Sequence, residues 1–287
     1  MTLCPIPQAQ RIASLSTECV DVIYRLGAQD RLVGISGYTR YPARARHEKP
    51  KVSGFSTGKL ERILAVQPDL VIGYSHIQGK LLHEVAAQGI ATHCYMHRDL
   101  AGIHAMVLDL GERLGEQAQA QALSQHLQRL QDQVAQAAAR LPVRPRVYFE
   151  EWHSPLTCGI QWVSELIAQA GGIDIFAERA PLDPFSARAV TTSEVLAARP
   201  QLILGSWCGQ AFDTAQVLAR PGFAELDALV LPMPSSDILA PGPVAIERGL
   251  VQIFQAVCQA VGTTPQALGF TPPALADADE AVEGDPA

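Results

Sequence analysis

The chain contains 287 residues, of which 48% are hydrophobic, and its net charge is -7. This length favours two compact domains over one, and the acidic balance excludes the broad positive field that attracts nucleic acids. No apolar run approaches the roughly 18 residues that cross a bilayer, so the sequence predicts neither a nucleic-acid partner nor membrane insertion.

Strands and helices are predicted to alternate along the first third of the chain. Apolar residues change from every second position to helical spacing and back, and Gly27 and Gly89 follow two of the predicted helices. The predicted elements, in order, are a strand at 11–16, a helix at 18–26, a strand at 32–36, a helix at 60–66, a strand at 69–73 and a helix at 81–88. This alternation is typical of a largely parallel sheet.

A single long helix is predicted at residues 115–141. After Gly115 the segment is rich in Ala, Gln and Leu, contains neither Gly nor Pro, and ends before Pro142. At about 1.5 Å per residue such a helix spans roughly 40 Å, which would bridge two lobes rigidly. The chain is therefore divided into an N-terminal α/β lobe at 1–114, the linker helix at 115–141, a C-terminal α/β lobe at 142–274, and an acidic tail at 275–287 that is predicted to be disordered.

The C-terminal lobe repeats the pattern of the N-terminal one. Its predicted elements are a strand at 146–149, a helix at 163–170, a helix at 195–198 and a strand at 202–205. Residues 60–73 match residues 192–205 without a gap and share a Leu-Ala pair, a Pro, a Leu and the final Gly. The match predicts two related Rossmann-like α/β lobes with mostly parallel sheets, although helix, Pro and strand is also a common α/β phrase that can recur by chance.

The cysteines and histidines lack metal-binding spacing. The six cysteines are Cys4, Cys19, Cys94, Cys158, Cys208 and Cys258. None forms a CxxC pair and most lie in apolar runs, so they are interpreted as reduced thiols. The candidates for a transition-metal site are His76, His153 and Cys208, or His93 and Cys94 with His97. Because His93 and Cys94 are neighbours in an expected strand, their side chains would point to opposite faces, and no dedicated metal site is predicted.

Several well-known catalytic motifs are absent from the sequence, which has no G-x-S-x-G, no phosphate-binding loop, no G-x-G-x-x-G and no HExxH. Glu150, Glu151 and His153 are the strongest acid-base candidates, but adjacent residues at a strand end diverge and do not form a carboxylate pair. Cys158 would act as a nucleophile only with a base and an electropositive setting. We therefore expect a binding protein rather than an enzyme, with no catalytic residues and no cofactor.

Sequence phrases of the N-terminal half stand in a characteristic order. They are Leu26-Gly27 followed by Arg31-Leu32-Val33-Gly34, then Tyr38-x-x-Tyr41-Pro42, then Leu60-Glu61-Arg62 with Pro68-Asp69-Leu70. No single phrase is diagnostic, but their order and spacing, together with the linker helix, resemble the class III or helical-backbone binding proteins. Within that family the resemblance is closest to the cobalamin-binding components of ABC importers, and it covers about residues 11–262.

The resemblance implies a ligand in a cleft between the lobes, at the carboxyl ends of the strands, where open α/β sheets generally bind. The candidate ligand-binding residues are Tyr38, Tyr41, Phe55, Tyr74, Ser75, His76, Trp152, His153, Trp162, Trp207, Cys208 and Asp237. Phe55, Tyr74 and Asp237 match positions at which cobalamin binders of this family place aromatic residues and a carboxylate. Aromatic walls suit a flat apolar chelate with amide edges; the alternative is that these aromatic residues pack the rims of the lobes.

The chain is accordingly predicted to bind cobalamin or a related corrinoid as the substrate-binding component of an ABC importer. The leading alternatives are a ferric siderophore or haem as the ligand, or a cytoplasmic corrinoid chaperone or sensor. His76, His153 or Cys208 could reach the upper axial position of a cobalt corrinoid, or each could be an ordinary polar residue. The expected partner is a small metal chelate, and we expect a monomer.

Two glutamates are candidates for docking to the membrane subunits of an importer. Glu61 resembles the N-lobe glutamate of the family, whereas the gapless alignment places its counterpart at Ser193 and the carboxylate stands one residue on, at Glu194. The helix dipole alone also favours a carboxylate at a helix N-terminus. The resemblance implies a periplasmic protein, but no basic, apolar leader follows Met1, and the chain would be cytoplasmic if Met1 is the native start.

Overall fold

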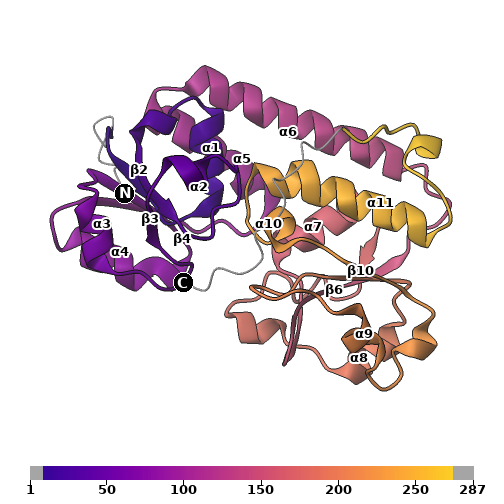
Figure 1. Cartoon of the computed structure of the whole chain (residues 1–287). Helices are drawn as coiled ribbons and strands as arrows, with labels where there is room; N and C mark the ends of the chain where they lie inside the picture. Colours follow the sequence, from indigo (N-terminus) through magenta and orange to yellow (C-terminus); the bar gives the residue numbers. More distant parts are fainter. Residues whose placement is uncertain (1–8, 274–287) are drawn as a thin grey trace. The chain divides into compact units, whose positions relative to one another are not determined.

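The computed structural model describes residues 9–273, which form two compact α/β units (Figure 1). Unit 1 contains the described residues up to His97 together with Ala101–His126, and unit 2 contains Arg98–Leu100 and the described residues from Leu127 onward. The tail predicted at 275–287 and Cys4 lie outside the described residues. The predicted fold class, two α/β lobes, is confirmed.

Unit 1 is built on a five-stranded sheet whose order is β3-β2-β1-β4-β5. All neighbouring strands pair in parallel, as the alternation of strands and helices predicted. The strands are β1 (Ile12–Ser14), β2 (Leu32–Ser36), β3 (Lys51–Ser53), β4 (Leu70–Tyr74) and β5 (Ala91–Tyr95). Because the strands are parallel, the residues that follow them gather at one edge of the sheet, which is called the unit 1 carboxyl edge below.

Helices cover both faces of the unit 1 sheet. They are α1 (Thr17–Arg25), η1 (Gln29–Arg31), α2 (Ala45–Glu48), α3 (Leu60–Ala65), η2 (His76–Gln78), α4 (Gly79–Ala86) and α5 (Leu100–Leu114). Successive residues of a strand face opposite ways: Leu70 and Ile72 of β4 pack in a cluster with α1 and α5, whereas Val71 packs in a cluster with α3 and α4. The sheet is therefore buried on both sides, which explains its nearly continuous apolar strands.

Helix α6 (Gln117–Ala138) is the long helix predicted within residues 115–141 (Figure 1). It passes from unit 1 to unit 2 between His126 and Leu127 without interruption. Its buried positions, including Leu127, Leu130 and Val134, recur three or four residues apart, which is the spacing of one helix face.

Unit 2 is built on a second sheet, ordered β10-β9-β6-β7, with β8 paired to β6. The strands are β6 (Arg146–His153), β7 (Leu156–Cys158), β8 (Ile173–Asp174), β9 (Leu202–Gly205) and β10 (Leu229–Pro232). All pairs are parallel except β6 with β7. Strand β6 runs to His153, beyond the predicted end at Phe149, because β7 folds back on its second half and pairs His153 with Leu156.

The helices of unit 2 are mostly short. They are α7 (Gln161–Gln169), η3 (Phe185–Arg188), α8 (Thr192–Ala198), α9 (Thr214–Leu218), η4 (Ala224–Leu226), α10 (Ser235–Ile238), the π-helix η5 (Ala245–Leu250), α11 (Val251–Ala260) and η6 (Gln266–Leu268). The core beside β6 and β9 includes Tyr148, Ile203, Val195 and Phe223.

The two matched sequence segments adopt the same order of elements, α3 then β4 in unit 1 and α8 then β9 in unit 2. Their shared glycines lie under side chains. A Cβ atom on Gly73 would stand 2.7 Å from Cδ1 of Leu82, and one on Gly205 would stand 1.7 Å from Cε2 of Phe212. At Gly205 the Phe212 ring would have to move to admit any side chain, whereas at Gly73 a shift of the Leu82 side chain would be needed.

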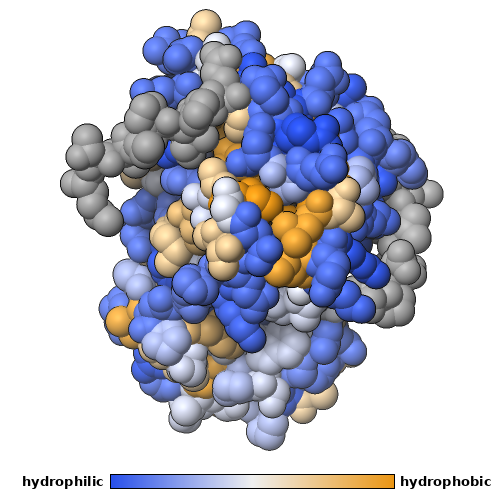
Figure 2. Space-filling model, turned by 90° about the vertical axis from the view of Figure 1, so that its left-hand side faces the viewer, coloured by the Kyte–Doolittle hydropathy of each residue, from blue (hydrophilic) through white to orange (hydrophobic). Residues whose placement is uncertain are grey.

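Hydrophilic residues cover most of the face shown in Figure 2, with hydrophobic residues among them. Over the described part of the chain, no helix combines the length and apolar character needed to cross a membrane.

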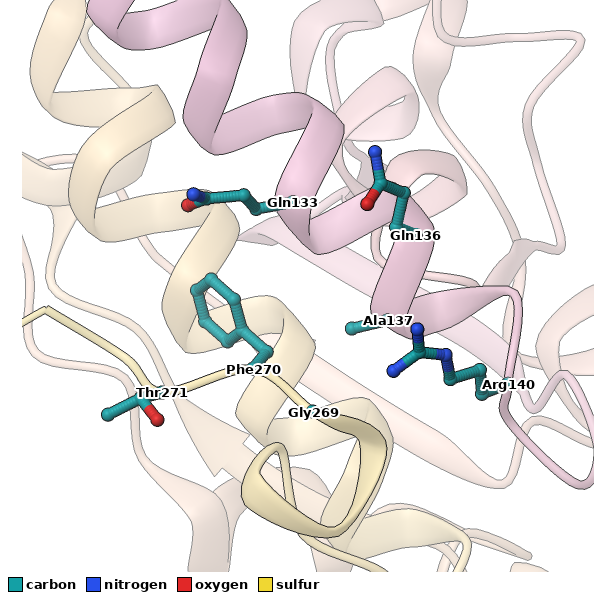
Figure 3. A pocket seen from close by; sticks show the side chains of 7 residues that line it. All are labelled: Gln133, Gln136, Ala137, Arg140, Gly269, Phe270 and Thr271. Carbon is teal, nitrogen blue, oxygen red and sulfur yellow. The ribbon is translucent and has the colours of Figure 1, made fainter.

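A polar pocket of about 300 Å³ opens in unit 2 beside the end of α6 (Figure 3). It is lined by Gln133, Gln136, Ala137, Arg140, Gly269, Phe270 and Thr271. Arg140 is already held there, because its Nη1 donates to the carbonyl of Leu268 at 3.0 Å. None of the residues singled out from the sequence lines this pocket.

Candidate ligand-binding site

Exposed apolar side chains mark the unit 1 carboxyl edge. The exposed fractions are 53% for Tyr38, 41% for Phe55, 47% for Ile77 and 54% for Met96, and these residues follow β2, β3, β4 and β5 in turn. The rings of Tyr38 and Phe55 meet edge to face, with centroids 6.4 Å apart. Large side chains exposed together on a mostly polar surface are typical of a binding surface. Leu108 of α5, at 42%, is exposed elsewhere in unit 1.

Gln78 ties the ends of three unit 1 strands together. Its Oε1 accepts from the backbone N–H of Tyr74 at 2.9 Å, and its Nε2 donates to the carbonyls of Leu15 at 3.1 Å and Phe55 at 2.9 Å. Gln78 is 4% exposed. Its amide therefore fixes the backbone of the Phe55 loop against β1 and β4, a role that the sequence did not reveal.

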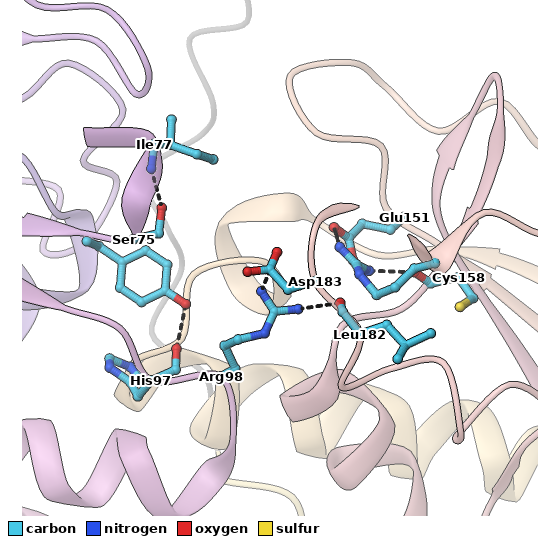
Figure 4. Close-up of polar contacts among 10 residues, drawn as sticks. Ser75, Ile77, His97, Arg98, Glu151, Cys158, Leu182 and Asp183 are labelled. Atoms are coloured by element: carbon cyan, nitrogen blue, oxygen red, sulfur yellow. Dashed lines mark hydrogen bonds and ion pairs between the residues drawn. The ribbon is translucent and has the colours of Figure 1, made fainter. Parts of the chain in front are cut away.

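Tyr74, Ser75 and His97 surround the end of β4 in a fixed arrangement. The Tyr74 hydroxyl donates to the carbonyl of His97 at 2.6 Å, and the two rings lie 5.3 Å apart. Ser75 has a positive φ of 62° and its Oγ accepts from the N–H of Ile77 at 3.3 Å (Figure 4). His76 follows in the same short η2 helix, and Tyr41 is partly buried beyond β2.

Buried polar atoms without hydrogen-bond partners also gather at the unit 1 carboxyl edge. Within residues 9–273 they include Oε1 of Glu18, Oγ1 of Thr39 and Oγ of Ser53, which stand at or after the ends of β1, β2 and β3. Burial raises the pKa of the Glu18 carboxyl above its usual 4.5, against a lowering by hydrogen bonds and His97. Buried polar groups generally have partners, so these atoms indicate room for water or ligand groups. Sequence reasoning missed all three.

The end of β6 carries two buried carboxylates that serve different arginines. Glu150 is fully buried; it accepts from Arg220 at 2.5 and 2.8 Å and from Trp207 Nε1 at 3.0 Å. Glu151 accepts from Arg188 at 2.6 and 2.9 Å. The expected divergence of the adjacent glutamates is confirmed.

Arg188 is 2% exposed and also donates to the carbonyl of Cys158 at 2.6 Å; Figure 4 shows this contact beside Glu151. Burial raises the pKa of the Cys158 thiol to about 12. A thiol with this pKa is protonated at neutral pH and is not an activated nucleophile.

Four aromatic rings follow one another at the carboxyl ends of β6 and β9, which form the unit 2 carboxyl edge. The ring of His153 lies 4.8 Å from that of Trp152 and 4.5 Å from that of Trp207, and Trp207 lies 5.0 Å from Phe212. Trp207 is 2% exposed, whereas Trp152 and His153 are partly exposed. The structure thus brings together three of the residues predicted in unit 2 and adds Phe212, which the sequence did not single out.

Two other predicted residues of unit 2 are engaged in its interior. Trp162 is 3% exposed on α7, and its Nε1 donates to the carbonyl of Ile238 at 2.8 Å. Asp237 is 2% exposed and accepts from Arg248 at 3.0 Å and Gln252 at 2.7 Å. Both side chains hold α10 in place in this structure. Their predicted ligand contacts remain predictions.

Cys208 follows Trp207 in an exposed loop. Although Cys208 is exposed, partial desolvation by the surrounding loop, and then the Glu151 carboxylate, raise the pKa of its thiol. Over residues 9–273, no group of three or more His, Cys, Asp or Glu side chains could hold a metal ion. His93 contacts the Tyr95 ring and Asp109, whereas Cys94 Sγ contacts the Ser75 carbonyl at 3.4 Å. The two adjacent side chains therefore contact different groups.

The two glutamates considered for docking differ. Glu61 is exposed in the first turn of α3. Glu194 forms a capping box with Thr191 at the start of α8 and an ion pair with Arg179. These contacts lower the pKa of Glu194 to about 2, with the Arg179 hydrogen bond as the first cause.

Arg98 anchors the chain segment between β5 and α5 to unit 2. Its Nη2 donates to the carbonyl of Leu182 at 3.0 Å, and its Nη1 lies 3.6 Å from Asp183 (Figure 4). Leu100 adds a backbone hydrogen bond to Glu165 at 2.8 Å. Neighbouring sequence gives no signal for these long-range partners, and they were not predicted.

Comparison with known proteins places this architecture in a family. A family model described as periplasmic binding protein matches residues 12–230. The chain belongs to this family of binding proteins. This confirms the resemblance seen in the sequence and supports a binding role at the family level.

Relatives and solved structures of the family extend the comparison. A vitamin B12-binding protein of Vibrio cholerae is 30% identical over 206 residues, which cover 70% of this chain and 72% of the relative. A vitamin B12-binding protein of Yersinia pestis is 28% identical over 228 residues, covering 76% of each chain.

Two solved structures share the fold at lower identity. The periplasmic haem-binding protein RhuT of Roseiflexus sp. RS-1 matches with a TM-score of 0.74 and 22% identity, over 88% of this chain and 99% of that one. The vitamin B12-binding protein BtuF of Vibrio cholerae matches with a TM-score of 0.70 and 21% identity, over 88% and 98%.

Proposed function

We propose that this protein binds cobalamin or a related corrinoid in the periplasm and delivers it to an ABC importer. It does so without catalysing a reaction. The observation that carries the proposal is the set of aromatic and apolar side chains at the carboxyl edges, Tyr38, Phe55, Ile77 and Met96 in unit 1 and Trp152, His153 and Trp207 in unit 2. A corrin presents a broad apolar face, which such side chains cover well. The relatives named as vitamin B12-binding proteins support the same ligand.

The charges of unit 2 favour a neutral ligand over an anionic one. Three arginines of unit 2 are each paired with a buried carboxylate: Arg188 with Glu151, Arg220 with Glu150 and Arg248 with Asp237. Removing an arginine from such a pair would leave a buried charge uncompensated. These arginines are therefore poorly suited to bind the carboxylates of haem or of a siderophore, whereas the amides of a corrin do not require a cation.

The proposed partner is the membrane part of an importer, and Glu61 is the better placed of the two docking candidates. Its carboxylate is exposed, whereas that of Glu194 is engaged by Thr191 and Arg179. Helix α6 is continuous from unit 1 to unit 2. A continuous helix opposes bending, because bending breaks its backbone hydrogen bonds, so we infer that binding and release require only small movements.

The test is calorimetric titration of the purified protein with cyanocobalamin, with haemin and a ferric siderophore as comparison ligands. Saturable binding of cyanocobalamin near one per chain, tighter than that of either comparison ligand, is the expected result. Binding of haemin or the siderophore without cyanocobalamin would overturn the ligand assignment and leave the family intact. Absence of binding for all three would contradict the proposed function.

A further inference from the structure

The aromatic cluster at the unit 2 carboxyl edge contains an imidazole. Of the eight histidines in the chain, His153 alone lies in unit 2. Its ring sits between two indoles, with centroids 4.8 Å from Trp152 and 4.5 Å from Trp207. A histidine packed between two tryptophans keeps a defined ring orientation, which is what a ligand to a metal centre needs.

Each neighbour of this imidazole is itself fixed. Trp207 donates its indole N–H to Glu150 at 3.0 Å, and Glu150 is held by Arg220 at 2.5 and 2.8 Å. Trp152 donates its indole N–H to the carbonyl of Ser154 at 2.9 Å. Both indoles that contact the His153 ring are therefore held by hydrogen bonds in which the imidazole takes no part.

One nitrogen of His153 has a partner that a ligand can displace. Its Nε2 lies 3.3 Å from Oε1 of Gln210, which is at the long limit for a hydrogen bond. Gln210 is exposed in the loop between β9 and α9. Replacing an exposed amide at this distance costs little, and neutral imidazole is the commonest metal ligand among protein side chains.

The other candidates of the sequence offer a poorer donor. Desolvation and then the Glu151 carboxylate raise the pKa of the Cys208 thiol, which disfavours the thiolate, the form that binds metals. His76 is exposed in the three-residue η2 helix of unit 1. His153 instead closes an eight-residue strand between fixed rings.

We propose that Nε2 of His153 coordinates the metal of the bound chelate at its upper axial position. With aquocobalamin, the cobalt–oxygen bond to water breaks, a cobalt–nitrogen bond forms from the imidazole lone pair, and water leaves without any change in oxidation state. With cyanocobalamin, cyanide keeps the axial position and His153 contacts the chelate without coordinating it. This inference rests on the proposed function. Its test needs a corrinoid whose axial ligand can be exchanged, such as aquocobalamin.

The experiment titrates the wild-type protein and its His153→Phe and His76→Phe variants with aquocobalamin and cyanocobalamin, following the visible spectrum and the heat. The phenylalanine at 153 keeps a ring between the tryptophans and removes the nitrogen. We expect a spectral shift of aquocobalamin with the wild type and with His76→Phe but not with His153→Phe, whose affinity for aquocobalamin falls at least about tenfold. Cyanocobalamin affinity should fall less than aquocobalamin affinity, because only aquocobalamin can form the cobalt–nitrogen bond, and urea denaturation of each variant checks separately that it is folded.

Other outcomes separate the two proposals. Wild-type binding of both corrinoids without an aquocobalamin shift, or a shift that survives His153→Phe, would overturn axial coordination and leave the proposed function standing. If His153→Phe loses cyanocobalamin binding, His153→Gln provides the second variant, with the same expectation. Failure of the wild type to bind either corrinoid would overturn the proposed function and this inference with it.

Discussion

The carboxyl edges of the two sheets present different surfaces. In unit 1 the large side chains at this edge are exposed, as Tyr38 and Phe55 are, and buried polar atoms such as Oε1 of Glu18 have no partner among residues 9–273. In unit 2, Trp207 donates its indole N–H to Glu150, which is paired with Arg220. The unit 1 edge thus presents exposed apolar side chains, whereas the unit 2 edge presents aromatic rings beside paired carboxylates and arginines. Within residues 9–273, buried polar atoms without a partner occur in both units, Oγ of Ser206 in unit 2 among them.

The two edges therefore contribute differently to the stability of the protein and to ligand binding. The exposed parts of these side chains contribute no burial energy to unit 1, and they gain it when a ligand removes them from water. A buried ion pair roughly breaks even in stability, but it fixes the groups that it contacts. Changes in unit 1 should therefore act mainly on binding, and changes beneath the unit 2 edge should act mainly on folding.

The largest expected effect comes from Arg220→Ala. It leaves the fully buried carboxylate of Glu150 without its charged partner, and loss of one partner from a buried pair typically costs about 3–5 kcal/mol of unfolding free energy. Urea denaturation followed by far-ultraviolet circular dichroism measures it.

The matched control for Arg220→Ala is Lys80→Ala. Lys80 and Glu84 form an exposed pair at 3.9 Å, with side-chain exposures of 91% and 43%, and such pairs contribute less than about 1 kcal/mol. Equal costs for the two substitutions would contradict a structural role for the Glu150–Arg220 pair.

An intermediate effect is expected for Phe55→Ala, on binding alone. Its side chain is 41% exposed, while its carbonyl remains bonded to Gln78. Affinity for cyanocobalamin should fall about tenfold, as for an anchoring aromatic residue, and unfolding free energy should change by less than about 0.5 kcal/mol. Leu108→Ala is the control, since Leu108 is 42% exposed on α5. Similar affinities for the two variants would place the ligand away from the unit 1 edge.

The smallest expected effect is on pH dependence. Burial raises the pKa of Glu18 above 4.5, so the folded state keeps this proton to higher pH than the unfolded state. Stability from this group therefore declines as pH rises from about 4.5 through the raised pKa. Glu18→Gln should remove the decline and gain stability relative to wild type at neutral pH but not below pH 4.5. Denaturation midpoints across that range measure it.

Glu194→Gln should show the opposite sign. The pKa of Glu194 is lowered to about 2 by Arg179 and Thr191, so its carboxylate stabilises the fold above the unfolded pKa and loses this effect as pH falls toward about 2. The variant should be less stable than wild type at neutral pH and approach it in acid. Parallel curves for the two glutamine variants would contradict the assigned shifts.

Regular elements were predictable from the sequence where local pattern decides the structure. Strands β2 (Leu32–Ser36) and β9 (Leu202–Gly205) were predicted residue for residue, because each is a short apolar run bounded by turn residues. Helix α6 was predicted from its composition and the flanking Gly115 and Pro142, with ends two or three residues inside the predicted limits.

Partners distant in the sequence were not predictable. Glu150 and Arg220 are 70 residues apart, and no local pattern shows that they meet. The tryptophans make the same point: all three looked alike from sequence, yet Trp162 is taken into the core of unit 2 while Trp152 stays partly exposed. The candidate ligand-binding residues could be named from the ends of the predicted strands, but which of their side chains face outward depends on how the helices pack.

All three tryptophans of the chain lie in unit 2, and unit 1 has none. Indole fluorescence of the unlabelled protein therefore reports on unit 2 alone. Trp162 senses its interior, while Trp152 and Trp207 sense the stack around His153. A coloured chelate held against those rings would quench the emission by energy transfer. The distribution of one residue type therefore gives unit 2 an optical signal of its own without any added probe.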